Sequence, residues 1–332
     1  WQPGESIALA RNPNYFRADE GLPRYDRLTY RFLGEQPDNN LAALAQGICD
    51  IVGEPTLLEE QLASVRNMTL NGTIQAFVSL GPEWEHLDFG VRPAAYDGGL
   101  NPAGVARQDY FSDLRVRQAF AACIDRQTLA SELFYNLSQV PSGFFPPDHP
   151  LYAADLPQQP FDPARGAALL DEVGWLDHDG DPATPRQALG VAGVLDGTPL
   201  SVTYTTTTDV LRRKTAERIA GMLRDCGIGI SVQTQDAGAL FAPGPEGPLF
   251  GRNFDLAQFA WQSGRGSPCF LYTGTQIPSA NNGWLGTNIT GWSNPEYDAA
   301  CQAALTANPA DPAAYQAANR QVEGIFAREL PV

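Results

Sequence analysis

Lysine is almost absent from this chain, and positive charge of any kind is scarce. Lys214 is the only lysine, and 22 basic residues face 38 acidic ones, for a formal net charge of −16. Such a surface repels phosphate backbones and anionic lipid headgroups, so nucleic acids and direct membrane binding are poor candidates for partners. No uninterrupted apolar run approaches the roughly 20 residues that cross a bilayer.

Histidine is equally scarce, which limits the chemistry the chain can perform. There are 3 histidines, and neither a G-x-S-x-G nor an H-E-x-x-H pattern occurs. Few histidines are therefore available to act as the base of a nucleophile–base pair, and the chain is expected not to be an enzyme. A secreted hydrolase that uses two carboxylates leaves no local signature and stays open as an alternative, as does a ligand sensor. No rhythm of eight strand–helix repeats suggests a barrel.

What the chain does have is enough apolar surface for large cores and many turns. Its 332 residues are 43% hydrophobic, with 32 glycines and 27 prolines. This length predicts one large or two medium domains. Alternation of apolar residues predicts strands at 6–10, 26–32, 49–52, 73–80, 84–89, 199–206, 228–234 and 254–261. Helical spacing and capping residues predict helices at 38–47, 56–67, Val116–Cys123, Leu129–Phe134, 162–173, 209–225, 294–307 and 311–328.

Several segments, in order, resemble the family 5 solute-binding proteins, which serve dipeptide, oligopeptide and nickel import. The segments are Trp1–Gly4 with Arg11–Phe16, Phe111–Phe120 with Ile124–Arg126, Phe161–Pro163 with Val173–Trp175, Gly227–Ile228, Phe254–Leu256, and Trp292–Pro295 with Tyr297–Asp298. Most of these residues have scaffold roles. Asp113 or Ser112, Asp125 and Asp162 fit helix N-caps, and Gly174 fits a helix end. Arg115 and Arg117 are expected to pair with carboxylates.

The resemblance implies an α/β fold of the periplasmic-binding-protein-like type II, a two-lobed clamp that closes on its ligand. It assigns residues 1–109 to the second segment of lobe I, 110–315 to lobe II and 316–332 to a helix returning toward lobe I. The opening part of lobe I is expected upstream. The implied protein is a monomeric substrate-binding component of an ABC importer, without a cofactor, which hands a peptide or similar small solute to a membrane permease. It is extracytoplasmic and lipid-anchored.

The leading ligand segment is the end of the strand that closes at Trp261, because loops at the carboxyl ends of strands line the cleft of such lobes. Trp261, Gln262 and Arg265 are the candidates there. In peptide-binding relatives an Asp stands three residues after the Trp and pairs with the ligand's amino terminus, whereas this chain has Gly264. Further candidates are Trp84, His86, Tyr272, Trp284 and Asn288.

An acidic run resembles the first half of a calcium loop. Asp177, Asp179 and Asp181 alternate as calcium ligands do, but Pro182 stands where an EF-hand needs Gly, and Ala188 where it needs Glu. An Asx-rich turn is therefore predicted in preference to a metal site.

Five cysteines form no C-x-x-C and have no neighbouring histidine, so a zinc site is not expected. Export, implied by the resemblance, favours disulfides. The predicted pairs are Cys123–Cys226 and Cys269–Cys301, with Cys49 left over.

Overall fold

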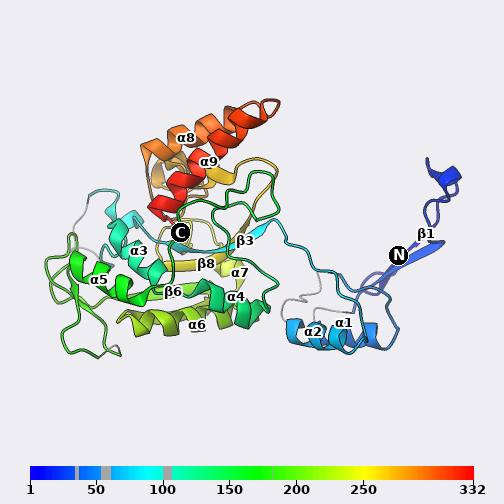
Figure 1. The fold of residues 1–332 in the computed structure, drawn as a ribbon, viewed down its shortest axis with the longest axis horizontal. Coiled ribbons are helices and arrows are strands. Elements are labelled where there is room, and N and C mark those ends of the chain that lie inside the picture. The colour runs from blue at the N-terminus through cyan, green and yellow to red at the C-terminus, as the bar shows by residue number, and fades with distance from the viewer. Residues whose placement is uncertain (34–36, 54–60, 100–106, 182) are drawn as a thin grey trace. The chain divides into compact units, whose positions relative to one another are not determined.

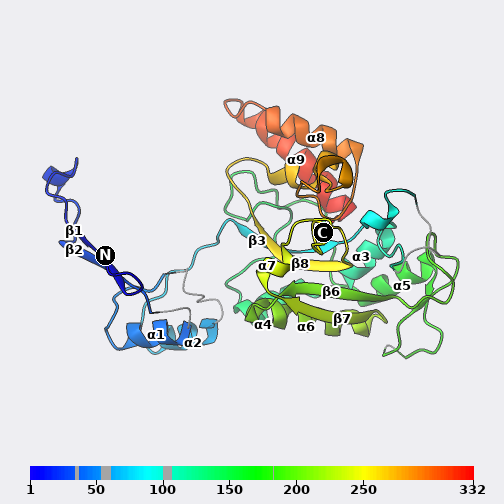
Figure 2. The ribbon, with the colours of Figure 1, turned by 180° about the vertical axis from the view of Figure 1, so that it is seen from behind.

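The structure is a computed structural model of the chain and describes residues 1–33, 37–53, 61–99, 107–181 and 183–332. Its contacts divide the chain into two compact units, Trp1–Val78 and Ser79–Val332, which are described separately below. Figures 1 and 2 show the elements of both. None of the helices within the described ranges is long and apolar enough to cross a bilayer.

The first unit contains one antiparallel strand pair and two helices. Strand β1 (Ser6–Ala10), which follows a turn in which Gly4 has a φ of 75°, pairs with β2 (Arg27–Arg31). The short 3-10 helix η1 covers Ala18–Glu20, and the helices are α1 (Pro37–Ala45) and α2 (Leu62–Leu70). Part of the helix predicted at 56–67 lies outside the described residues.

Two predicted strands of the first unit are wrong. Residues 49–52 and 73–80 form no strand, and Ile51 and Phe77 are 80% and 87% exposed. A short apolar run becomes a strand only where a neighbouring strand takes up its backbone hydrogen bonds. Neither run has such a neighbour among the described residues, so the apolar pattern alone was misleading.

The second unit is built on a four-stranded mixed sheet in the order β3-β8-β6-β7. The strands are β3 (Glu83–Phe89), β6 (Ser201–Thr207), β7 (Gly229–Gln235) and β8 (Leu256–Gln262). Strand β6 runs parallel to β7 and β8, and β3 runs antiparallel to β8. All four strands were predicted to within a few residues. A two-stranded piece joins β4 (Trp175–Leu176) to β5 (Gln187–Ala188).

The helices of the second unit form two groups, one above the strands and one beside and below them in Figures 1 and 2. One group comprises α3 (Leu114–Ala122), α4 (Arg126–Phe134), α5 (Pro163–Val173) and α6 (Val210–Asp225). The other comprises α8 (Pro295–Thr306) and α9 (Pro312–Glu329), which pack against each other. The short helices are α7 (Ala237–Leu240), η4 (Ala94–Tyr96), η6 (Pro268–Tyr272), η7 (Gly274–Gln276) and η8 (Ala280–Asn282).

Aspartates fix where the helices begin, as predicted. The side chains of Asp113, Asp125 and Asp162 each accept a hydrogen bond from a backbone N–H in the first turn of α3, α4 and α5. Asp113, not Ser112, caps α3. Gly174 ends α5 with a φ of 108°, a left-handed conformation that favours glycine.

The two arginines of α3 have different roles. Arg115 pairs with Asp113 at 2.6 Å, as predicted. For Arg117 the predicted carboxylate partner is wrong: its buried guanidinium donates to the carbonyl oxygens of Phe111, Glu329 and Leu330. A planar fork of donors suits several carbonyls at once, so Arg117 ties the chain after α9 to the start of α3.

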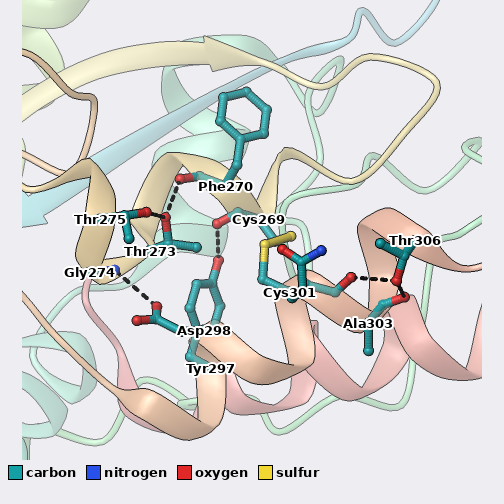
Figure 3. Close-up of a disulfide and its surroundings, with 11 residues drawn as sticks. Cys269, Phe270, Thr273, Gly274, Thr275, Tyr297, Asp298, Cys301, Ala303 and Thr306 are labelled. Carbon is teal, nitrogen blue, oxygen red and sulfur yellow. Dashed lines mark hydrogen bonds between the residues drawn. A yellow bond between two sulfur atoms is a disulfide. The ribbon is translucent and has the colours of Figure 1, made fainter.

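The structure contains both predicted disulfides. Cys123–Cys226 joins the ends of α3 and α6, and Cys269–Cys301 joins η6 to α8. Figure 3 shows the second bridge, with the Tyr297 hydroxyl donating to the carbonyl oxygen of Cys269 at 2.7 Å. Cys49, in the first unit, is not bridged, as predicted.

Candidate functional site

The carboxyl ends of the parallel strands and the start of β3 meet at one edge of the second unit's sheet. Residues 262–267, called here the strand-end loop, follow β8 at this edge. Its course is fixed by β3: the Gln262 amide donates to Glu83 at 2.7 Å, and the Ser263 N–H donates to the Pro82 carbonyl at 2.7 Å. Gln262 and Arg265 remain exposed. The ligand segment predicted from the sequence, which follows Trp261, therefore lies at this edge.

Four of the predicted site residues lie together directly behind this loop. The rings of Trp84 and His86 are 4.6 Å apart, and those of His86 and Trp261 are 6.4 Å apart and stacked. His86 Nδ1 lies 3.0 Å from Asp88 Oδ2, and the Tyr272 hydroxyl donates to Asp88 Oδ1 at 3.1 Å. Burial raises the pKa of Tyr272 well above its usual value, and the charge of Asp88 adds to the shift, so the phenol stays a donor.

Burial divides these four residues into supporting and accessible ones. Trp84, His86 and Tyr272 are at most 8% exposed, whereas Trp261 is only partly buried. The first three therefore form the floor behind the strand-end loop, and Trp261 stands at its border. Direct ligand contact stays a prediction for Trp261, Gln262 and Arg265.

Asn288 reaches this group through the backbone of Tyr272, whereas Trp284 lies elsewhere. Asn288 is fully buried and its amide donates to the carbonyl oxygens of Tyr272 and Trp292, which is a scaffold role. Trp284 has a φ of 63° and lies against Gly244, in the loop between α7 and β8. The sequence pattern could not separate these polar and aromatic residues from those at the strand end.

Beside the strand-end loop lies a cavity of about 200 Å³, called here the strand-end pocket. Its lining residues are Leu80, Gly81, Pro82, Pro146, Asp148, His149, Pro150 and Ser263. Sequence reasoning missed Asp148 and His149, because the Pro-rich stretch that contains them has no periodic pattern. The sequence signal for these two residues was an acidic residue next to a histidine, with prolines on both sides.

His149 positions one wall of this pocket. Its Nδ1 accepts from the Leu151 N–H at 3.1 Å, and its ring stacks on Phe145 with centroids 4.3 Å apart. The backbone of Gly264 lies beside the imidazole and tends to raise its pKa. Burial lowers the pKa of His149, against the opposing effects of Gly264 and Asp148, so the imidazole is neutral at pH 7. The ring, stacked on Phe145 and held through Nδ1, is therefore a positioning group beside Gly264.

Asp148 differs from its neighbour because its side chain is exposed at the pocket. No hydrogen bond or ion pair of its carboxylate occurs among the described residues. An unpaired carboxylate beside a small cavity is suited to a cationic group of a ligand.

The acidic run at 177–181 forms the predicted Asx turn. Asp177 Oδ1 accepts from the N–H groups of Asp179 and Gly180, and Asp179 Oδ1 accepts from the Asp181 N–H. The N–H of Asp181 and the Thr184 hydroxyl lower the pKa of Asp179. The carboxylates thus serve the turn itself. Within the described ranges no three His, Cys, Asp or Glu side chains gather as a metal site would require.

A larger cavity, of about 400 Å³, lies near the amino end of β8. Its lining includes the ion pair of Asp97 and the buried Arg252, with Thr275, Ser279 and Asn282. Asn282 and Ser279 are already joined in a capping box that starts η8. None of the predicted ligand residues lines either cavity, but the strand-end pocket includes Ser263, which directly follows Trp261 and Gln262, whereas the larger cavity includes no residue of the strand-end loop.

Comparison with known proteins relates this arrangement to one family. Residues 1–283 match the family model described as bacterial extracellular solute-binding proteins, family 5 Middle. The oligopeptide-binding protein AppA of Bacillus subtilis (strain 168) is 25% identical over 245 residues, or 71% of this chain and 37% of that protein. The nickel-binding periplasmic protein of Escherichia coli (strain K12) is 25% identical over 132 residues, or 40% of this chain and 24% of that protein.

Solved structures agree in fold. An oligopeptide binding protein from Thermus thermophilus, complexed with a pentapeptide, has a TM-score of 0.69 at 24% identity and is covered to 54% by this chain. NikA from Brucella suis, in complex with Fe(III)-EDTA, has a TM-score of 0.74 at 20% identity and is covered to 59%. The present chain thus spans little more than half of these structures and about a third of the AppA relative.

Proposed function

Since the chain belongs to the bacterial extracellular solute-binding proteins of family 5, we propose that its second unit forms one wall of a binding site for a peptide or similar small solute. The observation that carries this proposal is the strand-end pocket beside Trp261 and the exposed Gln262 and Arg265. Loops at the carboxyl ends of strands are where α/β lobes hold ligands. The full-length protein would act as a substrate-binding component of an ABC importer and not as an enzyme.

The remaining expectations form part of the same proposal. The first unit, within the expected lobe I segment of residues 1–109, would belong to the opposing lobe of a clamp, the helix of residues 316–332 would return toward it, and a membrane permease would receive the solute. The protein would work as a monomer outside the cytoplasm, attached by a lipid. Two disulfides favour an oxidising compartment, and the name of the E. coli relative is that of a periplasmic protein.

A blocked pocket tests the proposal. Gly81 lines the strand-end pocket, and a Cβ added there meets only the Glu83 nitrogen at 3.9 Å, so Gly81→Trp fills the cavity without a clash at Cβ. Gly98→Trp is the matched control, because Gly98 is exposed and a Cβ there meets nothing within 4 Å.

The measurement is native mass spectrometry of each variant with a tripeptide mixture that has free amino termini. We expect peptide adducts on the wild-type chain and on Gly98→Trp, and their loss on Gly81→Trp. Equal adducts on both variants would place the site elsewhere. No adduct on the wild-type chain would contradict peptide binding by this chain.

A further inference from the structure

A buried carboxyl group of α9 lies against the backbone that forms the strand-end pocket. Glu323 is 1% exposed, and the backbone N–H groups of Phe144 and Phe145 lie close enough to its carboxyl to lower its pKa against the larger effect of burial. Gly143 is adapted to this contact, because an added Cβ would collide with Glu323 Oε1. The φ of Gly143 is not in the left-handed region, so room for the carboxyl is the reason for glycine here.

Residues 143–151, called here the strap, transmit this contact to the strand-end loop at two points. The Ser263 hydroxyl, buried, donates to the Phe144 carbonyl. His149 stacks on Phe145 and lies beside the backbone of Gly264. The carboxyl of Glu323 therefore holds the strap, and the strap holds both Ser263 and Gly264 at the pocket.

Two buried side-chain oxygen atoms on α9 have no hydrogen-bond donor among the described residues, which favours a protonated carboxyl group on Glu323. Glu323 Oε2 and, one helical turn earlier, Asn319 Oδ1 both lack a hydrogen-bond donor, and Asn319 is fully buried. A proton on Glu323 would supply a donor on this face of α9, because residues four apart share a helix face. Burial raises the pKa of Glu323 to about 8, against the N–H groups of Phe145 and Phe144 and the charge of Arg320.

We propose that Glu323 is a positioning residue for the strand-end pocket, and that solute affinity depends on whether its carboxyl group holds a proton. The inference rests on the proposed function, because it concerns regulation of the same pocket. With the proton in place, the carboxyl is neutral and its contact with the strap is stable. Ionisation leaves a poorly compensated buried charge, which water can solvate only if the strap moves away. Affinity should therefore fall as the pH rises past the point where Glu323 ionises.

The other charged and titratable groups near Glu323 do not change state in this range. On α9, Arg320 is paired with Asp155. On α8, burial raises the pKa of Tyr297 well above its usual value. In the strap, burial lowers the pKa of His149, and Asp148 is a surface carboxylate. A response between pH 7 and 9 thus belongs to Glu323.

The test compares Glu323→Gln and Glu323→Ala with the wild-type chain at pH 6 and pH 9. The probe is the tripeptide mixture with acetylated amino termini, so that no peptide amine titrates between pH 6 and pH 9, and the readout is the midpoint of the tryptophan fluorescence change. Glutamine keeps an acceptor for the strap and adds a donor for Asn319, so it imitates the protonated acid without titrating. We expect the wild-type midpoint to rise at least threefold from pH 6 to pH 9, and Glu323→Gln to give the same midpoint at both. Glu323→Ala should bind weakly at both.

The outcomes separate the inference from the proposed function. A wild-type chain that binds equally well at pH 6 and 9, or a Glu323→Gln chain that keeps the wild-type dependence, overturns the inference alone. A wild-type chain that binds no peptide at pH 6 overturns the proposed function and the inference together.

Discussion

Trp84 lies directly opposite Trp261 in the register of β3 and β8. The two indoles differ in environment: Trp84 is 7% exposed and packs edge-on against Phe326 of α9, whereas Trp261 is only partly buried next to the strand-end loop. One tryptophan is thus anchored in the core, and the other borders the proposed site. A fluorescence change on solute binding should come from Trp261, which makes Trp261→Phe the variant that assigns the signal used above.

Asp148 should contribute charge to the site. The Asp148→Asn variant is expected to bind free-amine tripeptides roughly fivefold more weakly, the size typical of an exposed ion pair. The same peptides with acetylated amino termini should bind both chains alike, because they lack the cation. Asp225→Asn, at the exposed end of α6, is the charge-matched control. Equal losses for free and acetylated peptides would contradict a charge contact at Asp148.

The sequence predicted this site only in part, and the reason is physical. The strand-end loop after Trp261 could be found because a buried strand and the glycines after it are local signals. Asp148 reaches the pocket, and Glu323 reaches the strap beside it, only through the tertiary fold, since the strap and α9 come from distant parts of the chain. No local periodicity records such a contact.

The same distinction explains the fold. Asp113 and Asp162 mark helix starts through hydrogen bonds to their own first turns, so the helices were predicted closely. A strand needs a neighbouring strand to take up its backbone hydrogen bonds, and the predicted runs at 49–52 and 73–80 have no such neighbour among the described residues. Strand β3 has the same modest local pattern but forms seven paired positions with β8, from Glu83↔Gln262 to Phe89↔Leu256.

Stability should depend on pH through Glu323. The folded-state pKa of about 8 exceeds the ordinary value of 4.5, so the folded chain binds this proton more tightly than the unfolded chain. The stabilisation is complete below about pH 4.5 and is lost as the pH rises toward 8, by an amount on the order of a few kcal/mol. Glu323→Gln should lack this loss.

The measurement is urea unfolding of both chains between pH 5 and 9. The advantage of Glu323→Gln over the wild type should grow with pH and level off above pH 8. A constant difference across the range would show that Glu323 does not titrate there. Glu296→Gln, which alters an exposed ion pair with Arg328, controls for the removal of a carboxylate.

The two disulfides should differ in their effect on function. Replacing both cysteines of Cys123–Cys226, which are 103 residues apart, should cost about 5 kcal/mol of unfolding free energy, and replacing Cys269–Cys301, 32 residues apart, about 4 kcal/mol. Cys269–Cys301 fixes η6, which directly follows the strand-end loop, so only its loss should also weaken peptide binding. Urea unfolding and fluorescence titration of the two double-serine variants, below their unfolding transitions, check both statements. Equal binding losses would show that the bridges act on stability alone.

Tyr272→Phe isolates the buried hydrogen bond that organises the floor behind the strand-end loop. The substitution keeps the ring between Trp84 and Phe326 but removes the donor to Asp88, which is fully buried. A buried acceptor that loses its partner costs about 1–3 kcal/mol, so the free energy of unfolding should fall by that amount.

Tyr297→Phe is the matched control, since it removes an equally buried hydroxyl whose acceptor, the Cys269 carbonyl, is uncharged. Because a donor to a carboxylate is worth more than a donor to a carbonyl, Tyr272→Phe should be the more destabilising of the two in urea unfolding at pH 7. The reverse order would mean that Asp88 is satisfied by His86 and that the Tyr272 hydroxyl contributes little to the floor.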